Sequence, residues 1–159
     1  MGSARDKDVP GAGATLSGHA TGETPGPHDP PAPRLDVHRS VLIVDDERTI
    51  RELLIAVFAD LPGWAATAVP DGTEALATLA TLRPDLLVLD VNLPGLTGLE
   101  VYQRLRAQEA LAAVPVIFMT ASLQRAPADL VGPYCWVNKP FSLEELHTAA
   151  ATLLDLDGI

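Results

Sequence analysis

The chain has 159 residues, of which 47% are hydrophobic, and it carries a formal net charge of −10 with a pI near 4.6. This size suits one ordinary domain with a terminal extension. The acidic charge argues against direct binding to nucleic acids or to an anionic membrane. The sequence contains no apolar run of membrane-spanning length and no signal peptide, and its single cysteine, Cys135, excludes an internal disulfide. We therefore expect a cytoplasmic protein.

Residues 1–38 differ in composition from the remainder of the chain. They hold six of the fourteen prolines and six of the twelve glycines, with few large apolar residues. Such a segment buries too little surface to offset its conformational entropy. We predict a disordered Pro/Gly-rich leader over 1–38 and a folded domain over 39–159.

Beyond the leader, apolar runs alternate with segments of helical periodicity. The expected strands are residues 41–44, 65–69, 85–90, 114–120 and 134–138. The expected helices are residues 48–61, 71–82, 99–110 and 143–156, with a short fourth helix of a turn or two at 127–131. Ser142 and Glu145 form a capping-box pattern at the start of the last helix. This alternation predicts an α/β fold built on a doubly wound, five-stranded parallel sheet, (βα)5.

Polar side chains follow four of the expected strands. Asp45 and Asp46 follow the first strand, while Asp90, Thr120 and Lys139 end or follow the third, fourth and fifth. In open parallel sheets, ligands bind at the carboxyl ends of the strands. The topology is therefore expected to bring three carboxylates, a hydroxyl and an ammonium into one crevice.

This set of groups is suited to a divalent cation and a phosphoryl group. Mg²⁺ is commonly bound by one or two carboxylates with waters and phosphate oxygens, and an ammonium or a hydroxyl can bond phosphoryl oxygens. Lys139 is the only lysine between residues 40 and 159, where the other six basic residues are arginines. We expect it to act as a compact point charge in the site rather than as an ordinary surface lysine.

Four motifs carry a resemblance to a known family. They are VDDE at residues 44–47, LVLDVNLPGLTG at 87–98, VIFMTA at 116–121 and VNKPF at 137–141. In their order and spacing they resemble the receiver domain of two-component response regulators, of the chemotaxis-Y-like single-domain type. The resemblance implies a flavodoxin-like sheet with strand order 2-1-3-4-5. It further implies a stand-alone response regulator that signals through altered protein-protein contacts.

The resemblance also implies roles for the acidic residues. Asp90 would accept a phosphoryl group from a histidine kinase. Asp46 would bind Mg²⁺ directly, Asp45 would act partly through water, and Asn92 would offer its backbone carbonyl to the metal. Phosphoryl transfer depends mainly on alignment and charge neutralisation, so these roles agree with the chemistry of the residues.

Further roles follow from the same resemblance. Lys139 would pair with Asp90 or with the phosphoryl group, and its bond to Pro140 would be cis. Thr120 would contact a phosphoryl oxygen, and the small Ala121 would leave room for that group. Trp136 takes the position of the family's switch residue.

Two features depart from the family pattern. Most receivers carry tyrosine, phenylalanine or histidine at the position of Trp136, so an inward-turning switch ring and a fixed surface platform both remain open. The segment between Thr120 and Lys139 is also shorter than expected and contains Pro127 and Pro133. Because these prolines interrupt the fourth helix, partner choice and dimer mode cannot be transferred from the family.

Several functions remain as alternatives. The chain is expected to be no enzyme beyond its own phosphorylation and dephosphorylation. Its expected partners are a sensor histidine kinase or phosphotransfer protein and an unknown downstream protein, with a homodimer possible. Alternatives are a phosphorylation-independent module or a receiver fragment of a longer regulator. A haloacid-dehalogenase-type phosphatase is disfavoured because Glu47 stands two residues after Asp45, and an FMN carrier because these acids would repel its phosphate.

Overall fold

The computed structural model of the protein describes residues 39–122 and 127–155, so the predicted leader at 1–38 lies outside the described part. The strands are β1 (Arg39–Val44), β2 (Trp64–Val69), β3 (Leu86–Asp90), β4 (Val116–Thr120) and β5 (Tyr134–Asn138). The α-helices are α1 (Arg48–Ala59), α2 (Gly72–Leu79), α3 (Gly98–Arg106) and α4 (Leu143–Leu154), with a 3₁₀ helix, η1, at Glu109–Leu111.

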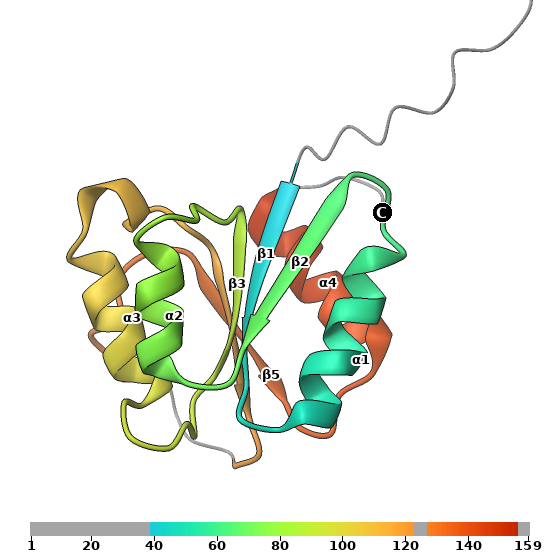
Figure 1. Ribbon diagram of the computed structural model, residues 1–159, viewed down its shortest axis with the longest axis horizontal. Helices are drawn as coiled ribbons and strands as arrows, with labels where there is room; N and C mark the ends of the chain where they lie inside the picture. The colour runs from blue at the N-terminus through green and yellow to red at the C-terminus, as the bar shows by residue number, and fades with distance from the viewer. Residues whose placement is uncertain (1–38, 123–126, 156–159) are drawn as a thin grey trace, which may run out of the picture. The chain divides into compact units, whose positions relative to one another are not determined.

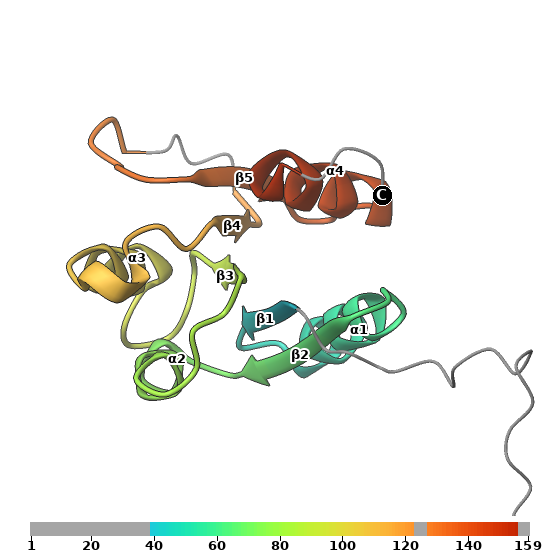
Figure 2. The ribbon, with the colours of Figure 1, turned by 90° about the horizontal axis from the view of Figure 1, so that it is seen from above.

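The five strands form one parallel sheet in the order β2-β1-β3-β4-β5, as predicted. Figure 1 shows that all strands run in the same direction, so their carboxyl ends share one edge. Figure 2 shows the sheet between two helical layers, with α1 and α4 on one face and α2 and α3 on the other. The strand order reverses next to β1, which places the ends of β1 and β3 side by side at the switch point.

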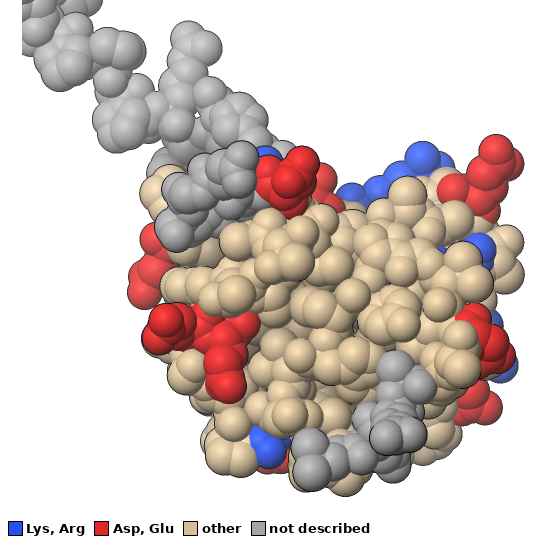
Figure 3. Space-filling model, turned by 180° about the vertical axis from the view of Figure 1, so that it is seen from behind, with Lys and Arg blue, Asp and Glu red and all other residues tan. Residues whose placement is uncertain are grey.

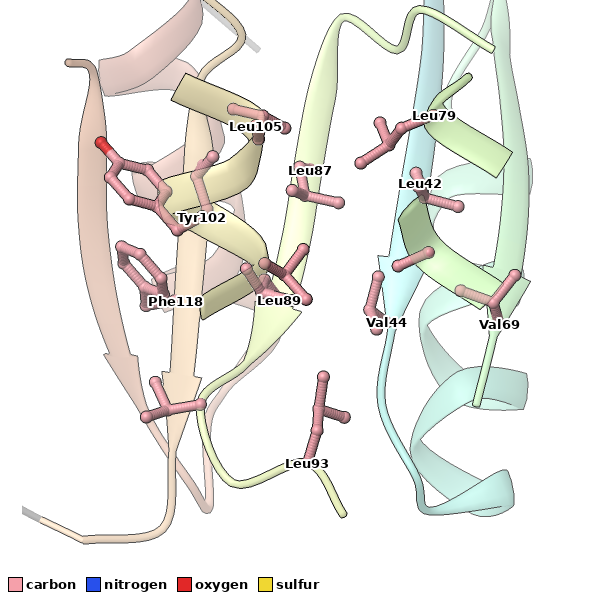
Figure 4. Packing of buried hydrophobic residues seen from close by; sticks show 14 of the residues in the cluster. Leu42, Val44, Val69, Leu79, Leu87, Leu89, Leu93, Tyr102, Leu105 and Phe118 are labelled. Atoms are coloured by element: carbon pink, nitrogen blue, oxygen red, sulfur yellow. The ribbon is translucent and has the colours of Figure 1, made fainter. Parts of the chain in front are cut away.

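The central strands β1 and β3 contain continuous buried aliphatic runs because both faces of the sheet are covered there. Leu42 and Val44 of β1 belong to the core on the side of α2 and α3, shown in Figure 4. Val41 and Ile43 belong to the core on the side of α1 and α4. All four side chains are at most 1% exposed. This two-sided burial anchors β1 and fixes the position of the acids that follow it.

Three helices begin with side-chain caps that satisfy free backbone amides. Asp71 accepts a hydrogen bond from the Glu74 N–H at the start of α2. Thr97 and Glu100 form a capping box at α3. The predicted capping box of Ser142 and Glu145 is confirmed at α4. In contrast, the N-cap residue of α1, Glu47, makes no side-chain capping bond.

The expected helix at residues 127–131 is wrong. The described residues form a turn instead, in which the Leu130 N–H donates to the Pro127 carbonyl (3.3 Å). Proline removes backbone donors, and Gly132 adopts φ +104°, a conformation incompatible with a right-handed helix. The described residues therefore contain four α-helices rather than the five expected from the strand-helix alternation.

Side chains of α3 bind the carbonyl groups of the connection before β5. The Tyr102 hydroxyl donates to the Val131 carbonyl (2.5 Å). The Arg106 guanidinium, which lies 4.4 Å from the centre of the Tyr102 ring, donates to the carbonyls of Val131 (3.2 Å) and Pro133 (3.0 Å). It also donates to the carbonyls of Leu111, Ala112 and Val114. The bonds to Val131 and Pro133 thus satisfy carbonyl groups of a segment that forms no helix of its own.

The helices are short, and charged side chains lie mainly at the margins of the visible surface (Figure 3). None of the helices in the described ranges has the length and apolar character needed to cross a bilayer. Figure 3 shows the molecule from behind, where the centre is largely uncharged and acidic side chains gather toward the margins.

Candidate functional site

The predicted site residues meet at the carboxyl edge of the sheet, the lower edge in Figure 1. Asp45 and Asp46 follow β1, Asp90 ends β3, and Lys139 follows β5. One carboxylate oxygen from each of the three aspartates lies within 4.8 Å of the others. Asp45 and Asp90 are 1% and 4% exposed, whereas Asp46 is open to solvent. Two of the acids are thus shielded from water, and the third is exposed to it.

The ammonium group of Lys139 bridges the two buried carboxylates. Its Nζ lies 2.6 Å from Asp45 Oδ2 and 3.0 Å from Asp90 Oδ2. The second oxygen of each carboxylate accepts a backbone N–H two residues further on, from Glu47 (2.8 Å) and Asn92 (2.9 Å). Each buried carboxylate is therefore held at both oxygens, which orients it firmly.

Burial and ion pairing act in opposite directions in this site. Burial raises the pKa of the Asp45 carboxyl above 3.8, although hydrogen bonds from Lys139 and from the Glu47 N–H oppose the shift. Burial by itself would lower the pKa of Lys139, but its bonds and charge interactions with Asp45 and Asp90 together raise the pKa above 10.5. The lysine is therefore a stable cation at neutral pH between two carboxylates.

The donor set fits Mg²⁺. With bonds of about 2.1 Å, two ligand atoms on opposite sides of an octahedral ion are roughly 4.2 Å apart. The clustered oxygens of Asp45, Asp46 and Asp90, within 4.8 Å of one another, are close to that size. The solvent-facing Asp46 leaves a side on which waters and phosphoryl oxygens complete the shell.

Arg51 is a site residue that the sequence did not reveal. Its Nη1 donates to the backbone carbonyls of Asp45 (2.8 Å) and Asp46 (3.1 Å). Arg51 lies one helical turn after Glu47, where it faces the acidic loop formed by Asp45, Asp46 and Glu47. The spacing is visible in the sequence, but backbone acceptors leave no pattern of side chains that would reveal the contact.

A protein-family comparison matches residues 41–151 to the response regulator receiver domain. The chain belongs to this family. It is 36% identical to the probable transcriptional regulatory protein TcrX of Mycobacterium tuberculosis over 123 residues, 76% of this chain and 51% of the relative. It is also 36% identical to the phosphate regulon regulator PhoB of Pseudomonas aeruginosa over 125 residues, 77% of this chain and 54% of the relative. The chain spans about half the length of these curated relatives.

Solved receiver structures share the fold. The chemotaxis protein CheY4 of Vibrio cholerae is similar with a TM-score of 0.63 and 30% identity, over 73% of this chain and 98% of that one. A receiver domain of a Pseudomonas aeruginosa sensor histidine kinase has a TM-score of 0.64 and 27% identity, over 74% of this chain and 98% of that one. That kinase receiver was solved with a magnesium ion coordinated in its active site cleft.

Thr120 ends β4, and Ala121 follows it at the same edge of the sheet in this receiver domain. Thr120 is buried, and its hydroxyl donates to the Ser122 carbonyl (2.8 Å) and accepts the Ser122 N–H (3.2 Å). Ala121 is exposed and lines a hollow of about 460 Å³. The other residues around this hollow are Glu47, Ile50, Leu53, Lys139, Pro140 and Phe141. The peptide bond between Lys139 and Pro140 is cis.

Trp136 packs against the sheet in this receiver domain. Its ring stacks on Phe118, with 4.7 Å between ring centroids and 23° between the planes. The indole Nε1 is enclosed and has no hydrogen-bond partner within the described ranges. On the same strand, partial burial raises the pKa of the Cys135 thiol to about 11, which leaves little reactive thiolate at neutral pH.

Proposed function

We propose that this receiver domain accepts a phosphoryl group on Asp90 from a sensor histidine kinase or phosphotransfer protein, with Mg²⁺ as cofactor, and signals through altered protein-protein contacts. The observation that carries the proposal is the Lys139 ammonium placed between Asp90 (3.0 Å) and Asp45 (2.6 Å). A cation at this point offsets charge on the nucleophile and on the incoming phosphoryl group.

In the proposed transfer, an Asp90 carboxylate oxygen forms the new bond to phosphorus as the phosphorus–nitrogen bond of the donor's phosphohistidine breaks. The electron pair of the broken bond remains on the imidazole nitrogen, which takes up a proton. Asp90 is held for this attack by the Asn92 N–H and by Lys139. Lys139 then bonds the phosphoryl oxygens in place of the carboxylate.

The proposed Mg²⁺ site consists of three carboxylates and one backbone carbonyl. Asp45, Asp46, Asp90 and the backbone carbonyl of Asn92 would hold Mg²⁺. When bound, the ion supplies positive charge that neutralises the phosphoryl oxygens and aligns them with the nucleophile. Support comes from the acidic cluster within 4.8 Å and from the similar kinase receiver with magnesium coordinated in its cleft.

The proposed read-out begins at Thr120. Its hydroxyl would exchange its bonds to Ser122 for one to a phosphoryl oxygen, and the small Ala121 would leave room for that group. Trp136 lies on the neighbouring strand β5, and its Nε1 is enclosed without a hydrogen-bond partner among the described residues. An enclosed donor without a partner is costly. If Trp136 rearranges on phosphorylation and Nε1 gains a partner, that bond would stabilise the phosphorylated state.

The phosphodonor would dock in the hollow beside Lys139. Its lining is largely apolar, and Leu53 is 45% exposed there. Exposed apolar side chains next to a reactive centre are typical of a protein contact. A Leu53→Arg variant should therefore slow transfer from a kinase while leaving phosphorylation by acetyl phosphate unchanged.

We place the protein in the cytoplasm as a stand-alone regulator without catalytic activity beyond its own phosphorylation and dephosphorylation. A second candidate is the receiver part of a transcriptional regulator, because the curated relatives TcrX and PhoB carry that description and are about twice the length of the matched region. A phosphorylation-independent module is the remaining alternative.

The deciding experiment is intact mass measurement after incubation with acetyl phosphate and Mg²⁺, with Asp90→Asn as the matched control. We expect a Mg²⁺-dependent phosphoryl adduct on the wild type alone. An unmodified wild type that binds Mg²⁺ and also resists a panel of phosphorylated kinases would favour the phosphorylation-independent module. Failure to bind Mg²⁺ would contradict the site itself.

A further inference from the structure

Arg51 joins the first turn of α1 to the backbone of the acidic loop. Both carbonyl groups it binds belong to proposed metal ligands, at 2.8 Å for Asp45 and 3.1 Å for Asp46. The shared donor atom is Nη1, which donates to both of these successive carbonyls. This bidentate contact restrains the peptide unit between the two acids, and with it the directions in which their carboxylates leave the chain.

The acidic loop has few other restraints on the side of Asp46 among the described residues. Asp45 is tied down by Lys139 and by the Glu47 N–H, but the Asp46 side chain is exposed. The next residue, Glu47, is the N-cap of α1 and makes no side-chain capping bond. The orientation of Asp46 therefore depends on its backbone, and Arg51 is a side chain that binds that backbone.

We propose that Arg51 is a positioning residue for the metal site, holding the main chain of Asp45 and Asp46 so that both carboxylates face one cation. This inference rests on the proposed function. Groups that orient metal ligands without touching the metal commonly change metal affinity by 10-fold or more when they are removed.

The direction in which Mg²⁺ affinity changes when Arg51 is removed distinguishes a positioning role from an effect of its charge. Arg51 carries a positive charge close to a cation site, so Coulomb repulsion alone predicts that its removal tightens Mg²⁺ binding. Loss of positioning predicts the opposite, because Asp46 no longer points consistently at the ion. A weaker affinity is therefore not explained by the loss of charge.

The same helix offers a matched control. Arg48 lies one turn earlier, and its side chain, 82% exposed, pairs with Glu52 at 2.7 Å. Arg48→Gln removes the same charge from the same end of α1 without altering the contacts to the acidic loop. Arg51→Lys keeps the charge but replaces the rigid, planar guanidinium with an ammonium on a shorter and more flexible side chain.

The experiment is titration calorimetry of the full chain with Mg²⁺, comparing wild type with Arg51→Gln, Arg51→Lys, Arg48→Gln and Asp46→Asn. Urea unfolding without Mg²⁺ reports whether each variant folds. We expect the Mg²⁺ dissociation constant to rise about 10-fold in Arg51→Gln and by a smaller factor in Arg51→Lys. In Arg48→Gln it should be unchanged or lower.

Two outcomes would overturn the inference. One is an Arg51→Gln variant, or a folded Arg51→Lys variant if the former does not fold, that binds Mg²⁺ as tightly as the wild type or more tightly. The other is equal weakening in Arg51→Gln and Arg48→Gln. The Asp46→Asn variant tests the proposed function separately: if it binds Mg²⁺ like the wild type, the metal site is wrong, whatever Arg51 does.

Discussion

Replacing Lys139 with methionine tests the electrostatic centre of the site. The substitution retains an unbranched apolar stem of similar length and removes the ammonium that bridges Asp45 (2.6 Å) and Asp90 (3.0 Å). The two carboxylates, 1% and 4% exposed, would then face each other without a counter-ion. Removing one partner of a buried ion pair costs about 3–5 kcal/mol. We expect a loss of about 3 kcal/mol in the free energy of unfolding, at the low end because the neighbouring Asp46 is exposed to water.

The loss of unfolding free energy in the Lys139→Met variant should be larger at high pH than at low pH. Burial already holds the pKa of Asp45 above its value in the unfolded chain, and loss of the lysine raises it further. A raised native pKa contributes stability at low pH that is lost as pH rises through that pKa. The Lys139→Met variant should therefore lie closer to the wild type at pH 5 than at pH 8.

Urea unfolding at pH 5 and pH 8, without Mg²⁺, measures both effects. Arg83→Met is the matched control, since it removes an exposed cation of the same charge. A loss below 1 kcal/mol at pH 8, or a loss of equal size at both pH values, would refute the proposal that Lys139 neutralises the two buried acids.

The remaining predictions concern the fold around the site. Gly132→Ala should destabilise the protein by about 3 kcal/mol, because the residue has φ +104° and a Cβ would overlap the Arg106 guanidinium. Gly95→Ala, with φ +73° and no neighbour within 4 Å, should cost only about 1 kcal/mol. Equal losses of the two variants in urea unfolding would contradict the clash with Arg106. Cys135 should react slowly with iodoacetamide at pH 9, because a pKa of about 11 leaves roughly 1% thiolate. A reaction of the folded protein as fast as that of the urea-unfolded protein would contradict this. Ser142→Ala should lower stability by about 1 kcal/mol through loss of the α4 cap, and thermal unfolding with no shift would contradict it.

The convergence of the site residues was predictable from strand ends. Asp45, Asp90 and Lys139 each follow a short apolar run, and parallel strands bring their carboxyl ends to one edge. The two-sided burial of the strands explains why this inference works, since continuous aliphatic runs mark central parallel strands. Strand-end position is therefore enough to predict that the aspartates are neighbours.

The sequence did not predict the detailed conformation of the connection between β4 and β5. The prolines at 127 and 133 indicated a short helix at most, but its absence depends on carbonyl groups bound by Tyr102 and Arg106 from α3. These donors are 25 or more residues away from their acceptors at Val131 and Pro133. Local propensity contains no information about such a distant partner.

Two different kinds of information thus specify this receiver domain. The sequence by itself determined the parallel sheet, its order through the family motifs, and the set of acids and lysine at its edge, because hydrophobic periodicity and strand-end position are local properties. Only the tertiary structure decided how those groups are held: Lys139 between Asp45 and Asp90, and Arg51 on the backbone of the acidic loop. Side-chain contacts to backbone carbonyls and to residues distant in sequence depend on packing of the whole domain, so no local pattern encodes them.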